Sequence, residues 1–303
     1  MSSQFSPRKP IMAVLLSLVL PGFGQFYNGE LNKAIWIFLA FAVLLVPGPA
    51  LIALYLPSFM MMPTLFVGLV LILALWFYGM ADAFRIARQK QDYRLQGWQL
   101  SGVYVLVFLL CNILALPVLT SEVRAHQVAS FLIPSVSMEP GLLPGDILFA
   151  DMRYDCPGCA TAVKRGDVAI FVYPDNRTQY FIKRIIGLPG DQIKISGETV
   201  WLNGRALTVR TEPGPAGQRW ATEEIGGRTW QVRWYTAQAL PDIAVTVPPG
   251  QAFVLGDNRN LSVDSRDFGT VPLQDVVGKA RQIWFSASKF DGLRWRRLGR
   301  VTQ

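Results

Sequence analysis

The stretch GDNRNLSVDSRDFG, residues 256–269, holds the densest polar chemistry in the chain. It follows the apolar residues 253–255, an approach that is typical of a strand entering a core. So many donors, acceptors and opposite charges beside a core strand need partners. Two interpretations fit this stretch alone. It is either a hydrogen-bonded turn in which Asp264 pairs with Arg266, or a loop that also holds a catalytic group.

The sequence on both sides of this loop predicts a β-rich domain. From residue 130 onward, short runs of β-forming residues alternate with Gly and Pro turns, which favours a mostly antiparallel β structure. Asn203-Gly204 predicts a two-residue hairpin turn. Residues 212–227, rich in Gly, Pro and Glu, predict a long loop within an inserted subdomain. The expected strands are 147–150, 168–173, 180–186, 193–196, 200–202, 229–234, 253–255 and 278–285.

The first part of the chain is far more apolar. It contains runs close to the ~20 apolar residues that cross a bilayer as a helix. A further apolar segment, 11–27, is interrupted by Pro21-Gly22, so we expect it to be either a re-entrant hairpin or a fourth span. The three predicted spans are 34–55, 63–80 and 102–119.

The orientation of these helices follows from their basic flanks. Residues 85–94, RIARQKQDYR, carry four basic side chains against Asp92, and the positive-inside rule assigns such a loop to the cytoplasm. Arg8-Lys9 should also lie inside, which favours the re-entrant form of the first segment. The chain is therefore expected to form a membrane domain over 1–122 and a domain on the outer side of the cytoplasmic membrane over 123–303.

A formal net charge of +8 would suggest nucleic acid as the partner of a soluble protein. Here the basic residues gather in the cytoplasmic loop and in the tail RWRRLGR, residues 294–300, where Trp295 and Leu298 are interleaved. Such a tail suits anionic lipid headgroups. We therefore expect the lipid bilayer, and not nucleic acid, to be the partner of these charges.

Three cysteines bear on cofactors and on the redox compartment. Cys111 lies inside a predicted span, where a small apolar packing role is expected. Cys156 and Cys159 form a CxxC pair, but structural zinc needs four ligands and the chain has no second CxxC and only one histidine, His126. A local disulfide is favoured over reduced thiols, and both over a metal or redox site. No metal or cofactor is expected.

Ser135 and Ser137 are candidate nucleophiles because Pro134 and Pro140 bracket them in a segment that cannot be a regular helix. Lys183 is a candidate base, since it shares a strand face with apolar neighbours. Lowering a lysine pKa from ~10.4 to near neutrality requires about 4 kcal/mol of preference for the neutral amine, which burial can supply. The alternatives are a plain turn, a lysine that reaches water, and a serine–histidine pair using His126.

Five segments between residues 130 and 286 occur in an ordered series. They are 134–140 (PSVSMEP) with Gly145-Asp146, 165–168 (RGDV) through Tyr173-Pro174, 182–191 (IKRIIGLPGD), 256–269, and Val271-Pro272 through Trp284. Together they resemble the bacterial type I signal peptidases, which are membrane-anchored serine proteases with a Ser/Lys dyad. The resemblance implies a two-part antiparallel β catalytic domain with an inserted β subdomain at about 192–248, following a multispan helical membrane region.

The resemblance also implies roles for individual residues. Ser137 would be the nucleophile and Lys183 the general base. Ser135 would join the Ser137 backbone N–H in stabilising the oxyanion, and Ser262 would orient the Lys183 amine. Asp264 and Arg266 would pair to hold the polar loop in place. The substrates would be secretory preproteins cut after small residues of the Ala-X-Ala type, and the expected pocket is lined by Phe131, Ile133, Pro134, Met138, Leu142 and Ile182.

Departures from the family pattern leave other functions open. Gly141 stands where Thr is common, and Phe181 replaces a common Tyr. Glu139 is an acidic neighbour of Ser137 that would favour protonated Lys183, so we expect it to point to solvent. The alternatives are a pilus or conjugation-type peptidase with one dedicated substrate, and a non-catalytic membrane scaffold. Residues 21–30 resemble a small two-helix membrane module of unknown role.

Overall fold

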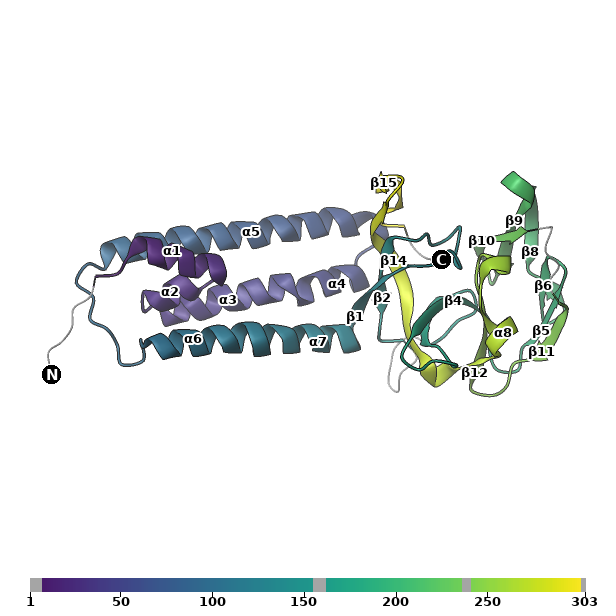
Figure 1. The fold of residues 1–303 in the computed structure, drawn as a ribbon, viewed down its shortest axis with the longest axis horizontal. Helices are drawn as coiled ribbons and strands as arrows, with labels where there is room; N and C mark the ends of the chain where they lie inside the picture. The colour runs from purple at the N-terminus through teal and green to yellow at the C-terminus, as the bar shows by residue number, and fades with distance from the viewer. Residues whose placement is uncertain (1–6, 155–161, 236–240, 301–303) are drawn as a thin grey trace. The chain divides into compact units, whose positions relative to one another are not determined.

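The computed structural model describes residues 7–154, 162–235 and 241–300. The chain divides into two compact units, Met1–Arg124 and Ala125–Gln303. The first unit consists of helices and the second of strands with short helical turns (Figure 1). The CxxC cysteines, Cys156 and Cys159, lie outside the described residues, and Cys111 is a half-buried free thiol.

The helices of the first unit are α1 Pro10–Val19, α2 Phe23–Tyr27, α3 Leu31–Leu45, α4 Pro47–Tyr55, α5 Ser58–Gln89, α6 Ser101–Leu109, a π-helical turn Leu110–Ala115, and α7 Leu116–His126. Three stretches are long and apolar enough to cross a membrane among the described residues: Leu31–Tyr55, Phe59–Gln89 and Ser101–His126. The segment 11–27 is interrupted as predicted, at Gly22, whose φ of +91° favours glycine.

Polar side chains in the first segment bind the long helix α5. Gln25 Nε2 donates to the carbonyl of Gly79 at 2.7 Å, and Asn28 Nδ2 donates to that of Ala83 at 2.8 Å. Both amides are fully buried. Side-chain amides that satisfy helix carbonyls in this way fix the packing of one apolar helix on another, which explains why the PGFGQFYNGE stretch carries polar residues at all.

The second unit contains three antiparallel sheets. The eight-stranded sheet has the order β1-β2-β14-β3-β4-β12-β13, with β15 beside β14, and the other two have the orders β10-β9-β8 and β11-β5-β6-β7. The strands are β1 Val128–Leu132, β2 Asp146–Asp151, β3 Val168–Val172, β4 Tyr180–Gly187, β5 Gln192–Ser196, β6 Thr199–Leu202, β7 Arg205–Ala206, β8 Thr208–Pro213, β9 Gln218–Ile225, β10 Arg228–Tyr235, β11 Ile243–Thr246, β12 Gln251–Leu255, β13 Val271–Pro272, β14 Val276–Ser288 and β15 Gly292–Leu293.

All eight predicted strands are confirmed within one to three residues at their ends, and so is the hairpin turn, where Asn203 and Gly204 both have positive φ. The predicted long loop at 212–227 is wrong. This stretch contains the end of β8, a short 3₁₀ turn and the whole of β9. Glu223 of β9 is fully buried and pairs with the guanidinium of Arg259. The buried face of the strand therefore carries a charged residue, and the alternation of apolar and polar residues that predicts a strand is lost.

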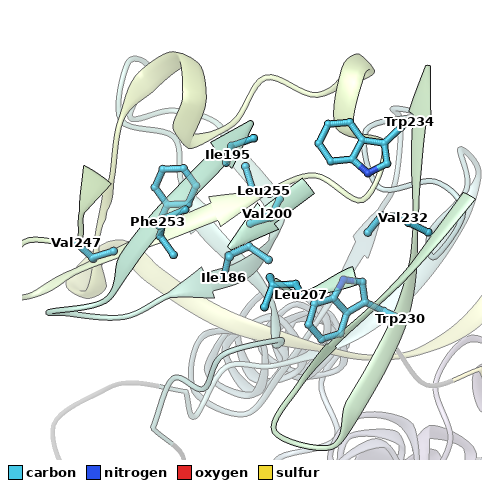
Figure 2. Packing of buried hydrophobic residues seen from close by; sticks show 12 residues of the cluster. Ile186, Ile195, Val200, Leu207, Trp230, Val232, Trp234, Val247, Phe253 and Leu255 are labelled. Atoms are coloured by element: carbon cyan, nitrogen blue, oxygen red, sulfur yellow. The ribbon is translucent and has the colours of Figure 1, made fainter. Parts of the chain in front are cut away.

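The two smaller sheets share a hydrophobic core with the large sheet. Ile195 and Val200 come from one small sheet, Trp230 and Trp234 from the other, and Phe253 from β12 (Figure 2). Burial of large aromatic and branched side chains dominates the stability of such a cluster. The strands of the two smaller sheets are therefore packed directly on the strands that flank the polar loop.

Two arginines of the basic tail, Arg294 and Arg297, form contacts inside the second unit. Arg297 forms a buried ion pair with Asp146, at 2.5 Å between Nη2 and Oδ2, and also donates to the carbonyl of Gly141. Arg294 donates to the carbonyls of Pro144 and Ala287. Trp295 is 72% exposed. The charges of Arg294 and Arg297 are thus used for internal contacts, so fewer basic side chains of the tail are available for the lipid contact that the sequence predicts.

Candidate active site

The candidate nucleophile lies in the connection between β1 and β2. This connection is closed by backbone hydrogen bonds from Ile133 to Asp146 and from Gly145 to Ile133, each 2.8 Å. The side chains of Ile133, Met138 and Leu142 are buried in the core beneath the large sheet. Apolar anchors thus fix both sides of residue 137. The Ser137 side chain is consequently held in place and is only 8% exposed.

Lys183 comes from β4, where it lies opposite Ala169 of β3. Its side chain is 4% exposed, and its Nζ lies 2.8 Å from Ser137 Oγ. A lysine that reaches water would leave its amine exposed, so that alternative is excluded for this residue. The contact joins residues 46 positions apart in sequence and brings a hydroxyl and an amine within hydrogen-bonding distance.

Burial lowers the pKa of Lys183 to about 8, because desolvation disfavours the ammonium form. Asp264, Asp257 and Asp267 oppose this shift by attracting the cation, while Arg266 adds to it by repulsion. A substantial fraction of the amine is therefore neutral near physiological pH. A neutral amine beside a serine hydroxyl can accept its proton, which is the requirement for a general base.

Two further serines were predicted to assist this pair. Ser135 Oγ lies 3.1 Å from Ser137 Oγ, within hydrogen-bonding distance. The Ser262 hydroxyl is buried, and it has no hydrogen-bond partner among the described residues. Ser262 nevertheless lies close to the nucleophile, since a Cβ added at Gly256 would overlap both its hydroxyl and the Ser137 carbonyl oxygen. Gly256 thus allows the two serine segments to approach.

Asp264 and Arg266 form the predicted pair inside the polar loop. Arg266 donates to Asp264 through Nε at 2.7 Å and through Nη2 at 2.8 Å, and Asp264 is fully buried. Asp264 also accepts from the Gly256 N–H and forms a reciprocal capping box with Asp267 at the start of α8, Ser265–Phe268. The loop is therefore braced by one carboxylate that satisfies several donors.

Two structural contacts were missed by reasoning from sequence. Arg184, adjacent to Lys183, makes a bidentate pair with Asp257 at 2.8 and 2.7 Å, and both side chains are almost completely buried. Asn258 donates to the carbonyls of Ser137 and Val136, each at 3.1 Å. Together these contacts tie the polar loop to the lysine strand and to the nucleophile. Their partners lie 73 to 122 residues away in sequence, so no local pattern reveals them.

The prediction that Glu139 points to solvent is wrong. Its carboxylate pairs with Arg233 of β10, and the two side chains are only 17% and 14% exposed. The reason is that β10 of the three-stranded sheet lies next to the nucleophile segment, which brings a cation to a carboxylate 94 residues earlier in the chain. The acidic neighbour of Ser137 is thus neutralised by a partner and not by water.

A pocket of about 350 Å³ opens beside the Ser137–Lys183 pair. Five of the six residues predicted to line the pocket do so. The sixth, Leu142, is buried and lines a separate cavity of about 240 Å³. No group of three or more His, Cys, Asp or Glu side chains among the described residues could hold a metal ion. The pocket is lined by Phe131, Leu132, Ile133, Pro134, Ser135, Ser137, Met138, Tyr180, Phe181, Ile182, Lys183, Leu261 and Val263.

Known proteins resemble this chain in sequence. The Pseudomonas aeruginosa PAO1 protein named signal peptidase I is 35% identical over 189 residues, which cover 54% of this chain and 66% of that protein. The Bacillus licheniformis protein of the same name is 32% identical over 169 residues, covering 55% of this chain and 82% of that protein. The match thus spans just under two thirds of the Pseudomonas relative and more of the Bacillus one.

A crystal structure of a signal peptidase I from Enterococcus faecalis V583 shares 29% sequence identity, covering 39% of this chain and 95% of that one, with a TM-score of 0.26. The family model for signal peptidase, peptidase S26, matches residues 103–285. That span is more than half of the 303 residues and includes both the nucleophile segment and the polar loop. The chain belongs to the signal peptidase family, peptidase S26.

Proposed function

We propose that the protein is a membrane-bound serine endopeptidase that removes signal peptides from secreted preproteins, with Ser137 as nucleophile and Lys183 as general base. The observation that carries the proposal is the 2.8 Å contact between Lys183 Nζ and Ser137 Oγ, in a site where burial lowers the lysine pKa to about 8. Family membership supports the same reaction. The non-catalytic scaffold is disfavoured, since a scaffold has no need of a buried amine beside a serine hydroxyl.

In the proposed mechanism, Ser137 Oγ attacks the carbonyl carbon of the scissile peptide while its proton passes to the Lys183 amine. The Ser137 N–H and the Ser135 hydroxyl then stabilise the oxyanion, a contribution that is commonly large in acyl transfer. The Lys183 ammonium next protonates the departing amine, which leaves an ester on Ser137. Lys183 finally takes a proton from a water molecule whose oxygen attacks the ester carbon. It returns that proton to Ser137 Oγ as the bond between Oγ and the carbonyl carbon breaks, which releases the signal peptide with a free carboxyl group and restores the serine.

Ser262 and the Asp264–Arg266 pair have supporting roles in this proposal. The Ser262 hydroxyl is buried and lacks a partner among the described residues, so it is free to hydrogen-bond the Lys183 amine during turnover. Asp264 holds the loop through Arg266 and the Gly256 N–H. Removing Ser262 should therefore change the orientation of the amine, whereas removing Asp264 should release the loop that carries it.

The pocket supports the assignment of the substrate. Phe131, Ile133 and Met138 give it an apolar wall next to Ser137 and Lys183. β1 is the outermost strand of the large sheet, so its free edge could hydrogen-bond an extended peptide that passes Ser137. We propose that the small side chains of an Ala-X-Ala site enter this pocket, which has an apolar lining directly beside Ser137 and Lys183.

We also propose that the protein lies in the bacterial cytoplasmic membrane, with residues 123–303 on the periplasmic side. The basic loop 85–94 and the apolar stretch Ser101–His126 that follows it support this orientation. A periplasmic reporter enzyme fused after Gln303 should be active. An inactive fusion at this position, together with an active cytoplasmic reporter fused at the same residue, would contradict the proposed orientation.

The reaction is tested with the full-length protein purified in detergent and a preprotein that carries an Ala-X-Ala site. The wild type should cleave it at that site, whereas Ser137→Ala and Lys183→Ala should not. Cleavage that persists in either variant would overturn the Ser/Lys assignment. If the wild type leaves general precursors intact but cleaves a single pilin-type precursor, the dedicated peptidase becomes the better description.

A further inference from the structure

Arg233 of β10 connects the inserted three-stranded sheet to both halves of the candidate active site. Its guanidinium pairs with Glu139, two residues after Ser137. Its backbone N–H donates to the Asp257 carbonyl at 2.8 Å, and it forms a parallel bridge with Asn258. Asn258 in turn donates to the Ser137 carbonyl. One residue thus contacts the nucleophile segment with its side chain and the polar loop with its main chain.

We propose that Arg233 is a positioning residue of the peptidase, which neutralises Glu139 so that this carboxylate does not favour the ammonium form of Lys183. The inference rests on the function proposed above, and it adds the inserted sheet to the catalytic apparatus. The mechanism as described does not use Arg233 or Glu139.

The charges around Lys183 give the physical reason. Three carboxylates of the polar loop, Asp257, Asp264 and Asp267, attract the ammonium, and Arg266 repels it. Asp257 is paired with Arg184, and Asp264 is paired with Arg266. Glu139 is a further carboxylate, on the nucleophile segment itself, and Arg233 is its ionic partner.

A guanidinium partner reduces the field of a carboxylate at more distant atoms, because the two opposite charges form a dipole. Removing Arg233 would leave Glu139 as an unpaired, largely buried charge, and such a charge acts over several ångströms in a low-dielectric site. Glu139 lies two residues after Ser137, and Ser137 Oγ lies 2.8 Å from Lys183 Nζ, so we infer that an unpaired charge at Glu139 would act on the amine. The ammonium form would be stabilised, and less neutral base would be available at a given pH.

The test is the pH dependence of kcat/KM for preprotein cleavage by the full-length protein. Arg233→Met should move the acid limb upward by on the order of one pH unit, so that kcat/KM at pH 7 falls about tenfold and recovers at high pH. Glu139→Gln should move the limb downward, because Arg233 is then an unpaired cation that repels the ammonium. The double variant Arg233→Met/Glu139→Gln should bring the limb back close to that of the wild type.

Arg219→Met is the matched control. Arg219 belongs to β9 of the same sheet and pairs with Glu198 on its surface, at 2.8 Å. This variant also loses one guanidinium and one ion pair, but it should leave the acid limb unchanged. An equal loss of kcat/KM at every pH in Arg233→Met, without recovery in the double variant, would show that Arg233 only supports the fold. If Arg233→Met does not fold, an unchanged or raised limb in Glu139→Gln overturns the inference.

A second readout separates this inference from the proposed function. The rate at which acetic anhydride labels Lys183, followed by mass spectrometry across pH, reports the pKa of the amine without any substrate. A wild type that cleaves no precursor would defeat the proposed function. The labelling curves of the three variants would still support the inference if their midpoints shift as described, and an unshifted midpoint in Arg233→Met would refute it.

Discussion

Lys183 Nζ lies 2.8 Å from Ser137 Oγ although neither residue is near the other in sequence, and both side chains are almost excluded from water. The contact depends on an arrangement that extends well beyond the two residues. The buried side chains of Ile133, Met138 and Leu142 anchor the nucleophile segment in the core. Strand β4, which carries Lys183, is hydrogen-bonded between β3 and β12. The polar loop then joins both through Asp257 and Asn258.

The first prediction concerns pH. The pKa of Lys183 is about 8 and its active form is the neutral amine, so kcat/KM should rise about tenfold per pH unit below 8 and level off above it. Initial rates of preprotein cleavage at low substrate concentration, measured from pH 6 to 10, test this. A limb centred near pH 6 would assign the titration to another group and would count against Lys183.

The second prediction concerns Ser262→Ala. Its hydroxyl is buried without a partner among the described residues, so losing it should leave the free energy of unfolding unchanged or slightly increased. The same change should lower kcat by about 10- to 100-fold, because the lysine amine loses the group that orients it during turnover. Thermal unfolding and steady-state rates are measured on the same preparation. A clear loss of stability with normal kcat would reverse the assignment.

The third prediction concerns Asp264→Ala. This change leaves the Arg266 guanidinium and the Gly256 N–H without their shared acceptor, and breaking such a buried pair costs about 3–5 kcal/mol. Asp264 also raises the pKa of Lys183, so the protein that remains folded should have its acid limb at lower pH. Denaturant unfolding and the pH profile check the two effects. Asp264→Asn, which keeps one acceptor oxygen, should be less damaging to stability.

The fourth prediction concerns stability in acid. Burial by itself would raise the pKa of Asp167, but hydrogen bonds from Lys279, Tyr154 and Arg228 hold it below the usual value. A depressed pKa stabilises the folded protein above the pKa of the unfolded chain, ~3.9, and this contribution is lost as pH falls through the folded value.

Asp167→Asn should therefore lower the free energy of unfolding at pH 7 by ~2 kcal/mol, because the buried side chain loses the charge that accepts hydrogen bonds from the partly exposed Lys279 and Arg228. The difference from the wild type should begin to shrink below about pH 4, where Asp167 of the unfolded chain takes up a proton, and it should vanish only below the lower pKa of the folded protein. Tryptophan fluorescence during guanidinium unfolding at pH 7, 5 and 3.5 measures this. A difference that stays constant across the three pH values would argue against ionisation of Asp167 as the cause.

Much of the fold could be predicted because local patterns specify it. The β-forming runs located eight strands, and the Asn-Gly pair located one hairpin turn. β9 was not predicted because its buried face includes the charged residue Glu223. The ion pair with Arg259, 36 residues away, compensates the burial of this charge, and no local pattern indicates that partner. The break at Pro21-Gly22 could also be predicted locally, because glycine adopts the positive φ found at Gly22 without steric cost.

The candidate site was likewise predicted only where local sequence identifies a residue. Ser137 and Lys183 could be named from sequence, and family membership is confirmed. The partners of their neighbours could not be named. Glu139 was expected to face water because nothing within 90 residues of it indicates Arg233, and the Arg184–Asp257 pair was hidden for the same reason. A charged residue in sequence reveals its charge but not the group that will neutralise it.

The fully buried contact between Glu223 and Arg259, 2.5 Å long, has a consequence for how relatives of this protein can diverge. Loss of either charge alone would leave the other buried without a partner, which strongly destabilises the folded protein. Substitutions at 223 and 259 should therefore occur together across related sequences, whereas the exposed hairpin ends of the same three-stranded sheet should tolerate changes in length. The ends of this sheet can then differ between relatives, whereas its contact with the polar loop has to be kept or replaced as a unit.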